Sequence, residues 1–281
     1  MVFESFLPES TFLRQFVAYY YSDGSADPSY RNSYLFYPHV NTTVSLYKNA
    51  VCSLSDHEVV VSYDADAKYL KLVTQQFLPR RALQIGKTDK VAIVFKPLGL
   101  NRFIPEKYST LVPNEAQLFS PLDGQEWDEM LDHLFDPKEI SRRTEILDNF
   151  LLQRFNSFEN GALEKAITML SDFENDLSID EIARAVRISR KTLLRYFKAE
   201  LRLTPRLFRM ILRFRFTLNK KIFEDSSDTL TQIAYEANFF DQPYFIKRFK
   251  LLTGVTPGQF FQSGMKLGNE DTFWTFELPG S

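Results

Sequence analysis

The chain has 281 residues, of which 44% are hydrophobic and 25% are charged, a balance typical of globular domains and a length sufficient for two of them. Its single cysteine, Cys52, excludes an intramolecular disulfide and any site built from several thiolates, as is typical of a reducing compartment. The sequence has no apolar run of about 18 residues and does not begin with a basic segment followed by an apolar one. We therefore expect a cytoplasmic protein with neither a membrane span nor a signal peptide.

The net charge of −2 conceals two parts of opposite sign. Residues 1–160 hold 16 Lys and Arg against 21 Asp and Glu, whereas residues 161–266 hold 18 against 12. A basic module joined to an acidic one is the pattern expected of a nucleic-acid-binding domain with a separate sensor. Charged residues that simply face solvent on helices would give similar totals, so charge alone does not decide between these interpretations.

Short runs rich in β-branched and aromatic residues recur in the first 120 residues, separated by turn-forming residues such as Pro38, Asn49 and Gly86. The runs are Tyr34–Tyr37, Thr43–Tyr47, Val59–Tyr63, Tyr69–Val73 and Val91–Phe95. This spacing predicts a barrel or a sandwich of strands. Five aromatic residues of the runs either line a ligand pocket or pack in the core: Tyr34, Phe36, Tyr37, Tyr47 and Tyr63.

Between residues 125 and 160 the apolar residues recur every three or four positions, which predicts two helices. The apolar residues include Trp127, Met130, Leu131 and Leu134 in the first helix, and Leu147, Phe150 and Leu151 in the second. These helices would either join two copies of the chain into a homodimer or pack on the strands of their own chain. The helical pattern then continues from residue 161 to about residue 264, and the tail, residues 267–281, has no clear pattern.

The helical part contains an internal repeat. Ser178–Ala183 matches Thr229–Ala234 at an offset of 51 residues, and a second set of matches follows at an offset of 52. The second set comprises Leu193, Arg195, Phe197, Lys198, Thr204, Pro205 and Phe208 in the first copy, and Phe245, Lys247, Phe249, Lys250, Thr256, Pro257 and Phe260 in the second. Each copy has the pattern of a short helix, a tight turn and a second helix.

Residues suited to cap helix starts stand at matching places: Ser178, Glu181 and Ser189 in the first copy, and Thr229, Gln232 and Asp241 in the second. The second helix of each copy carries polar or basic residues opposite its apolar face: Arg190, Lys191, Arg195 and Lys198, and then Gln242, Tyr244 and Lys247. A helix-turn-helix of this form places its second helix in the DNA major groove. Two copies joined by one helix, Pro205–Phe223, would reach major-groove faces about one helical turn apart. A purely structural helical repeat is the competing interpretation, and the basic outer faces and caps in both copies count against it.

Residues 162–263 resemble the C-terminal domain of the AraC (arabinose-regulator) family of bacterial transcription regulators. The matching motifs are Ile182-Ala183, Ile188-Ser189, Leu193-x-Arg195-x-Phe197-Lys198 and Thr204-Pro205, and then Ile233-Ala234, Phe239, Asp241-Gln242-x-Tyr244-Phe245-x-Lys247-x-Phe249-Lys250 and Gly254-x-Thr256-Pro257. The chain departs from the family pattern at Arg202 and Asn238, where glycine is usual, and at Pro243, Lys247 and Phe261. Lysine keeps the charge at position 247 but does not bind guanine bidentately, so the departures bear on sequence specificity more than on DNA binding.

The resemblance implies that double-stranded DNA is bound through Arg190, Lys191, Thr192, Arg195, Lys198, Gln242, Tyr244 and Lys247. It implies an α+β fold: a cupin-like β-barrel at residues 1–120 that senses a small-molecule effector, linking and dimerisation helices at 125–160, and an all-α domain of two helix-turn-helix units at 161–266. Further implied partners are a second copy of the chain and, if the protein activates transcription, RNA polymerase.

Two other classes of function stay open. A cupin-type carbohydrate-binding protein or enzyme with a degenerate helix-turn-helix appendage would need clustered metal ligands, but His39, His57 and His133 form no His-x-His pair. The sequence also has no Gly-x-Ser-x-Gly motif and no glycine-rich phosphate loop, so we expect no enzyme, no metal and no cofactor. The second class is a structural, partner-binding protein whose helix-turn-helix domain no longer binds DNA.

Overall fold

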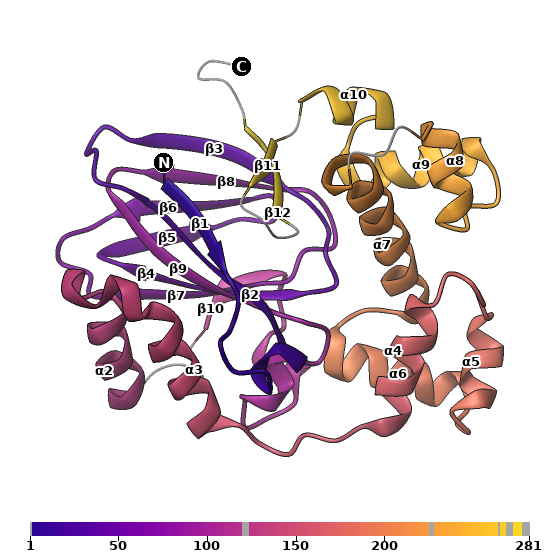
Figure 1. The fold of residues 1–281 in the computed structure, drawn as a ribbon, viewed down its shortest axis with the longest axis horizontal. Helices are drawn as coiled ribbons and strands as arrows, with labels where there is room; N and C mark the ends of the chain where they lie inside the picture. Colours follow the sequence, from indigo (N-terminus) through magenta and orange to yellow (C-terminus); the bar gives the residue numbers. More distant parts are fainter. Residues whose placement is uncertain (1, 120–123, 225–227, 264, 268–271, 277–281) are drawn as a thin grey trace.

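The computed structural model describes residues 2–119, 124–224, 228–263, 265–267 and 272–276. A strand-rich part comes first along the chain and a helical part follows it (Figure 1). The predicted α+β fold class is therefore confirmed.

The strand-rich part contains two six-stranded sheets, in the orders β1-β2-β9-β4-β7-β10 and β11-β12-β3-β8-β6-β5. The first ten strands are β1 Val2–Phe6, β2 Val17–Ser25, β3 Arg31–Phe36, β4 Thr42–Lys48, β5 Ala50–Leu54, β6 Glu58–Tyr63, β7 Tyr69–Thr74, β8 Arg80–Ile85, β9 Thr88–Phe95 and β10 Ala116–Leu118. The predicted runs all fall within strands or overlap them. Where a cupin-like barrel was expected, the described strands form two separate ladders that face each other, with no closed barrel.

The inner faces of the two sheets pack against each other through aromatic and small residues. Tyr19 and Tyr21 of β2 meet Tyr34 of β3 and Ala82 of β8 in one buried cluster. The first sheet is covered on its other face as well, because Val44 of β4 lies in the same core as the helices that follow the strands. This double coverage explains why β4 and β9 have long buried runs and lack a simple alternation of polar and apolar residues.

The helices predicted for residues 125–160 are α2, Gln125–Leu134, and α3, Arg143–Arg154. Their apolar residues, including Trp127, Leu131 and Phe150, pack on the outer face of the first sheet (Figure 1). Of the two interpretations left open for these helices, the structure therefore shows packing on the chain's own strands. Shorter helical turns accompany this part: η1 Leu13–Gln15, η2 Leu100–Arg102, α1 Tyr108–Leu111 and η4 Pro137–Arg142.

The helical part consists of α4 Gly161–Ser171, α5 Ile179–Ala185, α6 Arg190–Leu201, α7 Pro205–Leu218, a π-helical turn η5 Asn219–Phe223, α8 Leu230–Glu236, α9 Gln242–Thr253 and α10 Pro257–Ser263. Both predicted capping boxes are formed, by Ser178 with Glu181 and by Thr229 with Gln232. Each cap satisfies backbone amides that have no partner inside the helix. Helix boundaries in this part are therefore set by local sequence.

Two of the departures from the family pattern are at left-handed backbone positions. Arg202 ends α6 with a φ of 54°, where Gly254 ends α9 with a φ of 82°. Asn238 has a φ of 57°, as expected for a residue that replaces glycine in a tight turn. The chain therefore adopts a left-handed backbone without glycine at these two turns.

The end of the chain returns to the first part. Strands β11, Met265–Leu267, and β12, Thr272–Phe276, form a hairpin, and β12 pairs with β3 so that Trp274 stands opposite Phe36 (Figure 1). The tail had no predicted structure, and its residues 268–271 and 277–281 lie outside the described residues. The second sheet therefore includes β12, the last strand among the described residues.

Candidate nucleic-acid interface

The first helix-turn-helix unit consists of α5 and α6. Leu193 and Phe197 of α6 are completely buried in the domain core. Ser189 caps α6 by accepting a hydrogen bond from the backbone N–H of Thr192, with 3.0 Å between the two atoms. The predicted contact residues on the opposite face are exposed, except for the half-buried Thr192: Arg190, Lys191, Arg195 and Lys198. The local sequence thus fixes both the start of the helix and the face that it presents to solvent.

The second unit repeats this arrangement in α8 and α9. Phe245 and Phe249 are buried, and Asp241 accepts a hydrogen bond from the backbone N–H of Tyr244 at 2.7 Å. The three predicted contact residues of this unit are exposed: Gln242, Tyr244 and Lys247. All the residues predicted to bind DNA thus belong to α6 and α9, and none is buried.

A groove of about 480 Å³ lies between the two units, and both predicted interfaces border it. Arg190 at the start of α6 lines one side, and Tyr244 of α9 lines the other. Four further arginines line the groove, and the sequence analysis did not single them out: Arg206, Arg209 and Arg213 of α7, and Arg248 of α9. Their signal was present, because arginines at 206, 209 and 213 are three and four positions apart and share one face of a helix.

The first recognition helix also contacts the strand-rich part of the chain. Helix α1 packs beside α6, and Ser109 borders the same surface hollow as Lys191, Arg195 and Lys198. At the far end of α6, Asn101 donates a hydrogen bond to the buried carboxylate of Glu200. The strand-rich part of the chain is therefore in direct contact with a predicted recognition helix.

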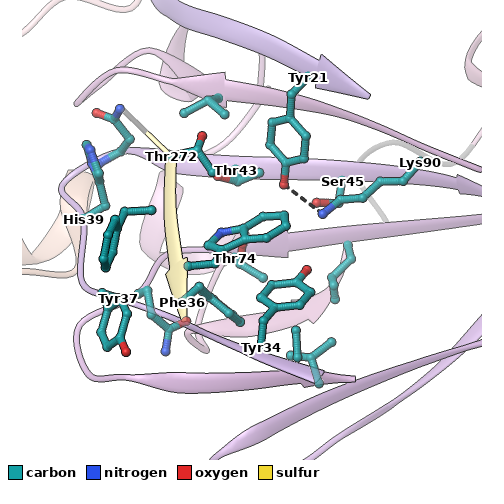
Figure 2. A pocket seen from close by; sticks show the side chains of 18 of the residues that line it. Tyr21, Tyr34, Phe36, Tyr37, His39, Thr43, Ser45, Thr74, Lys90 and Thr272 are labelled. Carbon is teal, nitrogen blue, oxygen red and sulfur yellow. Dashed lines mark hydrogen bonds between the residues drawn. The ribbon is translucent and has the colours of Figure 1, made fainter. Parts of the chain in front are cut away.

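A cavity of about 110 Å³ lies between the two sheets (Figure 2). Four of the five aromatic residues suggested for a ligand pocket line it: Tyr34, Phe36, Tyr37 and Tyr47. Tyr63, the fifth, is not among its lining residues and is 40% exposed. The wall also includes His39, together with residues that the sequence analysis did not connect with the cavity: Lys90, Arg215, Thr272 and Trp274.

Two basic residues far apart in sequence, Lys90 and Arg215, line the cavity. The buried ammonium group of Lys90 donates a hydrogen bond to the hydroxyl of Tyr21 at 2.8 Å (Figure 2). The Nζ of Lys90 lies 5.7 Å from the ring centroid of Trp274. Asp23 stands opposite Lys90 in the β2–β9 ladder. Burial raises the pKa of Tyr47 to about 12, although the charge of Lys90 opposes this rise. The cavity thus combines ring faces with a buried cation.

The described residues also bear on other classes of function. Among the described residues, no three His, Cys, Asp or Glu side chains form a group that could hold a metal ion. In the same part of the chain, no helix is both long enough and apolar enough to cross a membrane.

Comparisons with known proteins bear on the helical part. A family model described as a helix-turn-helix domain matches residues 182–263. The activator RhaS of Escherichia coli is 27% identical over 170 residues, which cover 54% of this chain and 59% of RhaS. The regulator MtrA of Neisseria gonorrhoeae is 29% identical over 91 residues, or 32% of this chain and 30% of MtrA. The matches thus span 30% of the length of MtrA and 59% of the length of RhaS.

Two solved structures are also similar to the chain. ToxT from Vibrio cholerae is 13% identical with a TM-score of 0.48, over 86% of this chain and 98% of that one. A regulator from Chromobacterium violaceum with an AraC-type DNA-binding domain is 28% identical with a TM-score of 0.31, over 35% of this chain and 87% of that one. The repeated capped units and the matched family model show that the C-terminal part of this chain is a tandem helix-turn-helix domain.

Proposed function

We propose that the whole chain is a sequence-specific DNA-binding transcription regulator whose DNA affinity is controlled by a small molecule bound between the two sheets. The observation that carries the proposal is the position of Arg190 and Tyr244, which start two recognition helices and border one groove. A duplex laid across that groove meets both helices together. Tandem units in one chain therefore allow reading of two successive major-groove segments without a symmetric dimer.

In this proposal the exposed residues of the two recognition helices contact the bases and phosphates of DNA. The contact residues are Arg190, Lys191, Thr192, Arg195 and Lys198 on the first helix, and Gln242, Tyr244 and Lys247 on the second. Arginine is suited to bidentate contact with guanine, glutamine to adenine, and lysine to phosphate. Arg195, in the middle of the exposed face of α6, is the residue we assign to base reading in the first unit.

The functions that we propose for the parts of the chain follow the predicted domain boundaries, with one change. Residues 1–120 form the sensor, 125–160 the helices that support its outer face, and 161–266 the DNA-binding domain. The change concerns β12, which adds Trp274 to the wall of the sensor cavity. Regulation by a ligand requires that it bind two arrangements of the protein with unequal affinity. Such a protein acts in the cytoplasm, and an activator of this kind would also contact RNA polymerase.

DNA binding is tested by selecting from random-sequence duplexes at several salt concentrations and sequencing the bound pool. We expect an enriched motif with two parts about one helical turn apart and an affinity that falls steeply with salt. Arg195→Ala should weaken binding to the selected site by about 1–3 kcal/mol and relax preference in one part of the motif. The proposal is wrong if the folded wild-type chain binds no duplex at low salt, with or without added metabolites.

Ligand binding has a separate readout in the cavity wall. The chain has two tryptophans, and Trp274 lines the cavity whereas Trp127 packs on the outer face of the first sheet. A Trp127→Phe variant therefore leaves one fluorescent reporter at the proposed site. A metabolite that changes Trp274 emission and shifts DNA affinity would identify the effector class, and a change in emission without a shift in DNA affinity would contradict the proposed control.

A further inference from the structure

The groove between the two units is lined on several sides by guanidinium groups. Its arginines come from three helices: Arg190 from α6, Arg206, Arg209 and Arg213 from α7, and Arg248 from α9. Two carboxylates oppose these five cations, those of Asp180 in the groove wall and Asp176 beside it. A surplus of positive charge in a concave surface attracts anions and concentrates the field within it.

The five arginines differ in how far they are already engaged. Arg209 and Arg213 pair with Asp176 at 3.6 Å and 2.7 Å, and both side chains are only 15% exposed, so these two mainly hold the fold together. Arg190 pairs with Asp180 at 3.3 Å, and both side chains are more than half exposed. Exposed ion pairs of this kind are weak, so an anion that binds arginine more strongly can displace Asp180 from Arg190.

Arg206 and Arg248 have no ion-pair partner among the residues that the structure describes. Arg206 is exposed near the start of α7. The guanidinium carbon of Arg248 lies 4.7 Å from the ring centroid of Tyr244, which holds the side chain at the groove without neutralising it. Arginine binds phosphate strongly because its planar N–H groups match the phosphate oxygens.

Bound DNA would present phosphates at this place. If α6 and α9 enter two successive major-groove segments on one face of a duplex, the minor groove between those segments faces the protein at the groove. Both backbones that border the minor groove then pass over α7. Contacts to phosphates position a protein on the duplex and carry no direct sequence information.

We propose that this groove binds the DNA backbone between the two recognition sites, with Arg206 and Arg248 as its open phosphate ligands and with Asp180 as an acidic residue that phosphate displaces from Arg190. The inference rests on the proposed function and extends it to residues outside the recognition helices' predicted contacts. In this arrangement Asp180 lowers the affinity for all DNA sequences, because its carboxylate repels phosphate and competes for Arg190.

The test compares full-length variants on the selected site and on random duplex at several salt concentrations. Arg206→Ala and Arg248→Ala should each lower the affinity for both DNAs by a similar factor, about 3- to 10-fold, and reduce the slope of log K against log salt by about one. Arg206→Lys should retain most of the slope, because a lysine still neutralises a phosphate. Lys165→Ala removes an exposed charge from α4, away from the groove, and serves as the matched control with an unchanged slope.

Asp180→Asn gives a result of opposite sign that a misfolded protein cannot produce. We expect it to raise the affinity for both DNAs by about 2- to 5-fold and to leave their ratio unchanged. If the wild-type chain binds its selected site and the Arg206, Arg248 and Asp180 variants keep its affinity and its salt slope, the groove does not contact DNA and the inference is wrong, while the proposed function stands. If the wild-type chain binds no DNA, the proposed function fails and the inference fails with it.

Discussion

The side-chain amide of Asn101 donates hydrogen bonds to both the carboxylate and the backbone carbonyl of Glu200, at 3.1 Å and 3.3 Å. Asn101 belongs to the turn η2 of the strand-rich part, and Glu200 lies one residue before the end of recognition helix α6. Both side chains are buried. This contact directly connects the strand-rich part with the first helix-turn-helix unit.

Tyr108 links this contact to polar residues of the strand-rich part, because its backbone N–H also donates a hydrogen bond to Glu200. Tyr108, in α1 beside α6, shares hydrogen bonds of 3.0 Å with Thr42 and with Gln75. The neighbours of these two residues, Thr43 and Thr74, line the cavity between the sheets. Burial raises the pKa of Tyr108 well above its ordinary value, so the hydroxyl keeps its proton and remains a donor.

The Asn101–Glu200 contact gives a prediction with a defined pH dependence. Burial raises the pKa of Glu200 above its ordinary value, and the hydrogen bond from Asn101 opposes this rise. Since the folded state holds the proton more tightly than the unfolded state, the free energy of unfolding falls as pH rises through the raised pKa. Glu200→Gln should remove that loss, so the variant gains stability relative to wild type as pH rises from 4 to 7, as measured by urea unfolding.

Asn101→Ala tests the same contact from its other side. The substitution removes the side-chain donor of the buried Glu200 carboxylate, which should cost about 1–3 kcal/mol. The double variant Asn101→Ala with Glu200→Gln should recover part of the loss. Equal stability of Asn101→Ala and wild type at neutral pH would show that the contact does not hold the two parts together.

Tyr108→Phe tests the route towards the cavity. Loss of the hydroxyl leaves the buried Thr42 and Gln75 without a shared partner and should lower the free energy of unfolding by about 1–2 kcal/mol. Without ligand, the Tyr108→Phe variant should bind DNA almost as tightly as wild type. The change in its DNA affinity on addition of an effector, identified with the Trp274 reporter, should be reduced. If the Tyr108→Phe variant keeps the full effector response, the Tyr108 hydroxyl does not couple the cavity to DNA binding.

Strand β12 should stabilise the strand-rich part of the protein. The Trp274 ring stacks on Tyr34 with centroids 4.0 Å apart and planes 14° apart, and the neighbouring Thr272 shares a buried hydrogen bond with Tyr19. Trp274→Ala should therefore cost about 3–5 kcal/mol in urea unfolding. Leu251→Ala, at a half-exposed position of α9, is the control and should cost well under 1 kcal/mol. Equal losses in the two variants would contradict a stabilising role for β12.

The ends of the two recognition helices offer a matched pair of substitutions. Gly254 has a left-handed backbone, and a Cβ added there would have no heavy atom within 4 Å, so Gly254→Ala should cost about 1 kcal/mol from backbone conformation alone. Arg202→Gly at the equivalent end of α6 relieves the same strain. It also removes the guanidinium that lies 5.6 Å from the ring centroid of Phe77.

In the Arg202→Gly variant, the free energy of unfolding of the helical domain should therefore rise by up to about 1 kcal/mol. The contact between the Arg202 guanidinium and the Phe77 ring is lost in the same variant. Thermal unfolding of both variants, read by far-ultraviolet circular dichroism, measures the first effect. Hydrogen exchange of the backbone amides around Phe77 measures the second. Stabilisation by Gly254→Ala would refute the account of the left-handed caps.

The sequence by itself determined the local features of the DNA-binding part. Helix starts at Ser178 and Thr229 depend on side chains three residues away, and the inward Leu193 and Phe197 follow from helical periodicity. These interactions span one or two turns, so a linear pattern contains them completely. The family resemblance depends on the same short-range positions, which is why the two units and their exposed faces could be identified before the fold was known.

Only the tertiary structure decided which distant residues meet. Trp274 reaches Tyr34 across 240 positions of sequence, Arg215 and Lys90 share a cavity wall, and Arg190 and Arg248 share a groove. The separation into two sheets and the use of α2 and α3 as a cover for one of them depend likewise on packing. The physical reason is that burial and charge act between residues that are close in space, whatever their separation in sequence. A strand rich in aromatic residues could pack against many apolar segments, and only the folded chain shows which one it contacts.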